Sequence, residues 1–144
     1  MTARRKAYLG SLAVWPLFLV IAVSLGAVRE AVVRPALGEQ AAHVIGTLLF
    51  IAAMLAITWL FVGKIGGTVE PLDLWLIGLM WMAMTMCFEF GFFHVVAGVP
   101  WEELLADYNL FAGRLWVLVL LTTLCGPALI SRWRGDHRRS RRSS

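Results

Sequence analysis

The chain of 144 residues contains few charged side chains, because Asp, Glu, Lys and Arg together make up only 15% of it. A soluble domain carries about 25% charged and about 45–50% apolar residues, whereas hydrophobic residues reach 60% in this sequence. This composition excludes a disordered or collagen-like chain. It also argues against an independent soluble enzyme.

Cysteine and recognisable catalytic motifs are equally scarce. Cys87 and Cys125 both lie inside apolar stretches, where a thiol behaves as a small hydrophobic group. The chain is therefore no disulfide-rich secreted domain, and it lacks the C-x-x-C spacing of redox motifs. It also lacks the H-x-x-x-H and E-x-x-H spacings of metal sites and any hydrolase or transferase signature. We therefore predict no metal site, identify no cofactor and do not favour an enzyme.

Long apolar runs dominate what is present. Four of them, at about residues 8–28, 41–62, 72–99 and 110–130, reach the roughly 20 apolar residues that a helix needs to cross a bilayer. The connections between them are short and contain helix-breaking glycine and proline. The sequence thus predicts an all-α integral membrane protein with four transmembrane helices in an antiparallel bundle.

The connection between the third and fourth runs, residues 100–108, predicts a short amphipathic helix in the membrane interface. Pro100 and the acidic residues behind it suit a helix start. Trp101, Leu104 and Tyr108 recur on one face at helical spacing, and Trp and Tyr favour the headgroup level. We interpret this helix as a connector, with a lid over a pocket as the alternative.

Basic residues concentrate at the two ends of the chain. Most of the 13 Lys and Arg residues lie there, namely Arg4, Arg5, Lys6, Arg132, Arg134, Arg138, Arg139, Arg141 and Arg142. The positive-inside rule therefore places both ends in the cytoplasm, at an inner membrane, and an even number of spans satisfies this. We expect residues 1–131 to form the transmembrane domain and residues 132–144 to form a disordered cytoplasmic tail. These ends attract anionic lipids of the bilayer, and no basic folded module points to nucleic acid.

The first run leaves one alternative open. Arg4, Arg5 and Lys6 precede an apolar run that ends in a small-x-small pattern at residues 24–27, which is also the pattern of a cleaved signal peptide. The run is longer than the apolar region of an ordinary signal peptide, and this favours a retained helix. Cleavage would leave three spans, with the carboxyl end still in the cytoplasm.

A few ionisable residues fall within or beside the apolar runs, toward the side predicted to face out of the cytoplasm. Such residues are costly in a membrane and usually face the protein interior with a partner. At ~1.5 Å per residue, Glu89 lies in the outer half of the third helix, and the others reach similar depths. The candidate polar cluster comprises Arg29, Glu30, His43, Glu89, His94, Asp107 and Arg114.

The chemistry of this cluster has several interpretations. Glu89 and Arg114 could form a buried ion pair that fixes helix packing. His43, Glu89 and His94 are acceptable metal ligands, but Glu89 and His94 lie five residues apart, ~140° around a helix. A carboxyl group and an imidazole that titrates near neutrality could relay protons, and the planar fork of Arg114 could hold a carboxylate or phosphate.

These interpretations give three classes of function. We favour a small-ligand or ion binding or transport component that uses the outward-facing Glu/His/Arg cluster. The alternatives are a non-catalytic assembly or scaffold subunit of a membrane complex, in which the cluster is structural, and a membrane enzyme that acts on a lipid-phase substrate. Because four short spans enclose little volume, we expect a homo-oligomer or a subunit of a larger membrane complex.

Overall fold

The computed structural model describes the backbone of residues 2–106 and 115–142, and the side chains of these residues up to 135. Every regular element in this part of the chain is a helix. Their bounds are α1 Ala3–Val28, η1 Arg29–Val33, α2 Arg34–Leu37, α3 Glu39–Ile65, α4 Pro71–Phe88, η2 Glu89–Val96, α5 Trp101–Ala106 and α6 Trp116–Arg142, where η marks π-helical segments that continue the preceding α-helix.

Four continuous helical stretches are long and apolar enough to cross a membrane. They are Ala3–Leu37, Glu39–Ile65, Pro71–Val96 and Trp116–Gly135. The predicted all-helical architecture and its four apolar helices are therefore confirmed. The predicted third run ends later than its helix, since the helical backbone stops at Val96. The expected start of the fourth run, at residue 110, lies outside the described residues.

Local sequence signals account for the helix ends. Thr2 precedes α1, and its side chain accepts a hydrogen bond from the Arg5 backbone N–H. Glu70 and Asp73 form a reciprocal capping box around Pro71 at the start of α4. Gly38 separates α2 from α3 with a φ of 85°, a left-handed conformation that glycine adopts without a steric penalty.

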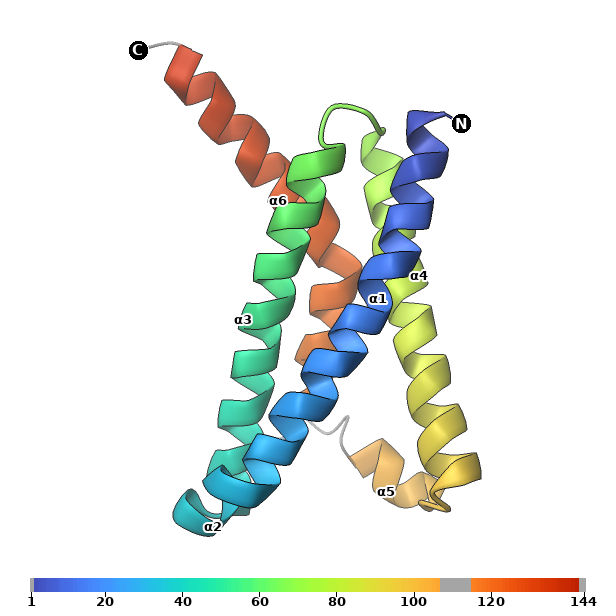
Figure 1. Ribbon diagram of the computed structural model, residues 1–144, viewed down its shortest axis with the longest axis vertical. Helices are drawn as coiled ribbons and strands as arrows, with labels where there is room; N and C mark the ends of the chain where they lie inside the picture. The colour runs from blue at the N-terminus through green and yellow to red at the C-terminus, as the bar shows by residue number, and fades with distance from the viewer. Residues whose placement is uncertain (1, 107–114, 143–144) are drawn as a thin grey trace.

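The two ends of the molecule differ in what they contain (Figure 1). The start of α1, the end of α6 and the α3–α4 connection lie together at one end, called here the terminal end. The short helices α2 and α5 lie at the opposite end, called here the α5 end. Helix α6 packs against both α3 and α4, and α1 crosses in front of them, close to α4 in its first half and away from it toward the α5 end.

The core lies in the half of the molecule nearer the terminal end. The fully buried Trp81 of α4 donates a hydrogen bond from Nε1 to the Ser11 carbonyl of α1 at 2.8 Å. Its ring meets Phe18 edge to face, with a 5.0 Å distance between ring centroids. One turn earlier on α4, Gly78 allows the backbones of α4 and α6 to approach closely at Leu124. These contacts hold α1, α4 and α6 together.

The backbone of α6 continues as a helix to Arg142, past residue 131 where we predicted the transmembrane domain to end. Arg has a high helix propensity, and the first turn past residue 131 also packs on α3, where the Arg134 guanidinium lies 4.4 Å from the centre of the Trp59 ring. The predicted short helix between the third and fourth runs is also present, as α5 (Trp101–Ala106).

Candidate functional site

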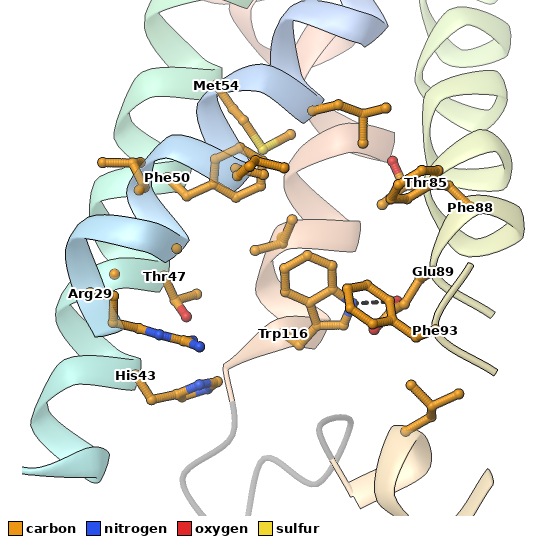
Figure 2. A pocket seen from close by; sticks show the side chains of 18 of the residues that line it. Arg29, His43, Thr47, Phe50, Met54, Thr85, Phe88, Glu89, Phe93 and Trp116 are labelled. Atoms are coloured by element: carbon orange, nitrogen blue, oxygen red, sulfur yellow. Dashed lines mark hydrogen bonds between the residues drawn. The ribbon is translucent and has the colours of Figure 1, made fainter. Parts of the chain in front are cut away.

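A cavity of ≈ 490 Å³ lies in the half of the molecule nearer the α5 end. Its walls come from α1, α3, the α4–η2 helix, α5 and α6. Figure 2 shows Arg29 and His43 on one side of it, Glu89 and Phe93 on the other, and Trp116 between them. The cavity therefore brings together residues from separate parts of the sequence.

Helical spacing explains which side chains reach the cavity. On α3, His43, Thr47, Phe50 and Met54 follow one another at intervals of three or four residues, so they share one face of the helix. The same spacing on α1 turns residues 19, 22, 23, 26 and 29 toward the cavity. Each helix thus contributes one stripe of side chains to the wall.

Glu89 is the buried carboxyl group of this cavity. It begins η2, where the helix changes to the wider π-helical hydrogen-bonding pattern, a feature found frequently at functional sites. Its side chain is only 6% exposed, and its Oε2 accepts a hydrogen bond from the indole Nε1 of Trp116 at 2.7 Å (Figure 2). This bond satisfies one oxygen of a carboxyl group that water does not reach freely.

His43 is the buried imidazole on the opposite wall. Its Nε2 accepts a hydrogen bond from the backbone N–H of Leu115, just before α6, at 3.1 Å. Because a ring nitrogen that accepts carries no proton, a neutral His43 holds its proton on Nδ1. The two buried groups, Glu89 and His43, therefore both bond to residues at the beginning of α6.

Arg29 contributes a partly exposed cation to the cavity wall. Its Nε and Nη2 donate to Glu30 Oε1 at 3.1 and 2.8 Å, and Arg34 Nη1 donates to Glu30 Oε2 at 2.7 Å. The Glu30–Arg34 pair matches the surface pairing expected for residues four apart on a helix. The aliphatic stem of Arg29 lies against Gly46, where an added Cβ would stand 3.2 Å from the Arg29 Cδ.

The structure brings Arg29, His43 and Glu89 to one cavity, and it places two other members of the predicted cluster beside it. Glu30 lies outside the cavity, between its two arginine partners. His94 also lies outside, with Nδ1 2.8 Å from the Val99 carbonyl oxygen. Its ring lies against the Trp101 ring at a tilt of 32°, with 4.1 Å between the ring centroids, and this contact joins η2 to α5.

Asp107 and Arg114 lie outside the described residues, so the expected pairing of Arg114 with Glu89 stays a prediction. A functional role for the cluster stays a prediction as well. Within residues 2–106 and 115–135, no group of three or more His, Cys, Asp or Glu side chains could hold a metal ion. Cys87 and Cys125 are both free thiols.

Sequence reasoning missed two features of the polar groups. Trp116 donates to Glu89, but nothing distinguishes it in the sequence from the other Trp residues of the chain. At the terminal end, Asp73 is only 1% exposed, and its Oδ1 accepts from Arg4 Nε at 2.8 Å and from the Tyr8 hydroxyl at 2.9 Å. This network ties α1 to α4, and none of its residues belongs to the predicted polar cluster.

Comparison of the chain with protein-family models, curated proteins and solved structures finds no match. The chemistry of the cavity must therefore be argued from its own residues.

Proposed function

We propose that the chain is a multi-pass inner-membrane protein that binds a small ligand in the cavity between its helices, as a binding or transport component. The observation that carries this proposal is the ≈ 490 Å³ cavity with Arg29, His43 and Glu89 in its wall. Ligand sites typically occupy about 300–1,000 Å³, with mainly apolar walls and a few polar groups that orient the ligand. Arg29 can donate hydrogen bonds to a ligand, and Glu89 can accept them from one.

The charge distribution supports an antiparallel four-helix arrangement with both ends of the chain in the cytoplasm. Arg4, Arg5 and Lys6 lie at the terminal end, whereas Glu102 and Glu103 lie on α5 at the opposite end. Under the positive-inside rule, the terminal end faces the cytoplasm and can attract anionic lipids. The cavity would then open on the extracytoplasmic side, and the chain would work as a homo-oligomer or within a larger membrane complex.

Cysteine labelling tests this orientation. In a background without Cys87 and Cys125, single cysteines are placed at Glu39, Gly67 and Ser140, and intact cells are treated with a membrane-impermeant maleimide. We expect labelling at Glu39 alone, because Gly67 and Ser140 would be cytoplasmic, and labelling of all three after the cells are opened. Labelling of Ser140 in intact cells would overturn the proposed orientation.

A matched pair of substitutions tests ligand binding. At Gly26, which lines the cavity, an added Cβ meets nothing within 4 Å, so Gly26→Phe should direct a ring into the cavity space. Ala27 is the next residue, is exposed and does not line the cavity, so Ala27→Phe is the control. The full chain is purified from membranes in detergent, and extracted small molecules are identified by untargeted mass spectrometry.

We expect a molecule in near-stoichiometric amount with the wild-type chain and with Ala27→Phe, and an at least tenfold smaller amount with Gly26→Phe. If the three proteins carry the same molecules in the same amounts, the cavity is not a binding site and the proposal fails.

An assembly or scaffold subunit is the second candidate, and one observation favours it. Glu89 and His43 bond to Trp116 and Leu115, which lie at adjacent positions where α6 begins, so they fasten α6 to η2 and α3. Glu89→Gln separates the two functions. Loss of the bound molecule at normal protein abundance supports binding, whereas a lower abundance with the molecule retained supports the structural role.

A further inference from the structure

The side of the cavity between α1 and η2 is open toward the outer surface of the molecule. Val23 of α1 and Phe93 of η2 both line the cavity, yet they are 69% and 41% exposed. The contacts that join α1 to α4 run from Phe18 on Trp81 to Trp15, which bonds to Thr85 and meets the Phe88 ring at the end of α4. Beyond them α1 leans away from α4 (Figure 1). The cavity can therefore be reached sideways through this gap.

The rim of this gap is apolar. Val20, next to the opening on α1, and Phe92, next to Phe93 on η2, are exposed as well. Both helices belong to stretches that are long and apolar enough to cross a membrane. In a bilayer, such a rim faces lipid chains rather than water. A ligand that enters here comes from the lipid phase.

The wall of the cavity changes from apolar to polar along the length of the cavity. Met54 and Phe50 line the part farther from the α5 end, whereas Arg29, His43 and Glu89 line the part nearer to it (Figure 2). Val119, one turn of α6 beyond Trp116, also lines the cavity. Thr123 in the apolar part donates to the Leu120 carbonyl oxygen of its own helix, so its hydroxyl does not require a polar ligand. The cavity matches a molecule with an apolar chain and a polar head group.

The size of the cavity suits part of one amphiphile. Its ≈ 490 Å³ lies within the about 300–1,000 Å³ of a typical ligand site. We assign this space to one apolar chain and its head group. A second chain of a two-chain lipid would lie outside, across the open gap.

We propose that the ligand is an amphiphile of the bilayer, which enters between α1 and η2, places one apolar chain along Met54 and Val119, and sets its head group against Arg29, His43 and Glu89. This inference rests on the proposed binding function and adds the ligand's class and its route. The mixture of a guanidinium donor and a carboxylate acceptor favours a zwitterionic or uncharged hydrogen-bonding head group over a simple ion.

Photolabelling tests the route and the class. The full chain is reconstituted in phosphatidylcholine nanodiscs in which a small fraction of the lipid carries a diazirine midway along one acyl chain. After irradiation, labelled residues are mapped by peptide mass spectrometry. Met54 is only 2% exposed and lines the cavity, so surrounding lipid reaches it only through the cavity. Leu48 and Leu49, exposed on the same helix, report labelling from the surrounding bilayer.

We expect labelling of Met54 in the wild-type chain, an at least fivefold decrease in Gly26→Phe, and no change in Ala27→Phe, each relative to Leu48. Arg29→Gln should lower Met54 labelling at least threefold, because the head group loses its donor. Absence of label at Met54 while Leu48 is labelled would overturn the inference. Equal labelling of Met54 in Arg29→Gln and in the wild-type chain would mean that the lipid chain enters the cavity without recognition of its head group. This result would also overturn the inference.

The two experiments together distinguish a failure of the lipid inference from a failure of the proposed binding function. A water-soluble molecule that co-purifies with the wild-type chain and is lost in Gly26→Phe, without any label at Met54, would uphold binding and refute the lipid route. No molecule sensitive to Gly26→Phe, together with an unlabelled Met54, would refute both.

Discussion

The tightest helix contact in the described part of the chain makes Gly78 the most informative position for a stability measurement. A Cβ at Gly78 would fall well inside contact distance of the Leu124 carbonyl oxygen, 2.8 Å from the Leu124 carbonyl carbon and 2.9 Å from the Thr123 carbonyl oxygen. These atoms belong to the backbone of α6, so no side chain can rotate away. Gly78→Ala must therefore push α4 and α6 apart.

The expected cost follows from that displacement. Overpacking in a core costs about 1–3 kcal/mol and occasionally more. A separation of roughly 0.5–1 Å forfeits about a quarter to a half of the dispersion energy of each contact across the interface. Ile77 and Trp81, both fully buried on α4, lose contacts in this way. Alanine regains about 1 kcal/mol of helix propensity, so we expect a net loss of up to about 2 kcal/mol in the free energy of unfolding.

Gly26→Ala provides the matched control, because an added Cβ there meets nothing within 4 Å. That substitution should be neutral or stabilise the helix by up to about 1 kcal/mol. Both variants and the wild type are unfolded thermally in detergent and followed by circular dichroism. The Gly78 variant should melt several degrees below the Gly26 variant. If the two melt together, the close approach of α4 and α6 is refuted.

Two further predictions concern hydrogen bonds that indole rings donate. Trp81→Phe keeps an aromatic ring but leaves the Ser11 carbonyl without its donor, so we expect a loss of about 1–3 kcal/mol in the same melting experiment. Trp75→Phe, at an exposed position of α4, should change stability by less than about 0.5 kcal/mol. Trp116→Phe removes the donor to Glu89 Oε2 and should also cost about 1–3 kcal/mol. A melting temperature equal to that of the wild type would contradict either indole prediction.

The candidate site was only partly within reach of sequence reasoning. Counting residues along each helix placed Arg29, His43 and Glu89 toward the same end, and all three line one cavity. The same counting included His94, which lies outside the cavity and bonds to the Val99 carbonyl oxygen. Depth along a helix follows from residue number, but the direction of a side chain around the helix depends on the neighbouring helices.

The buried acid at the terminal end illustrates the same limit. Asp73 follows Pro71 and Glu70, so its capping role is visible in the local sequence. Its bonds to Arg4 and Tyr8 join residues more than sixty positions apart. No local pattern specifies that pairing, because it exists only once α1 lies against α4.

The amino-acid sequence by itself determined the number of apolar helices and their approximate positions, because length, hydrophobicity and capping act within one segment. Thr2, Gly38 and Pro71 mark such ends. Only the tertiary structure decided which faces of these helices meet. The helices are apolar nearly all round, so hydrophobic periodicity does not single out an inward face. Packing alone left the cavity open beside α1 and brought Trp116 to Glu89.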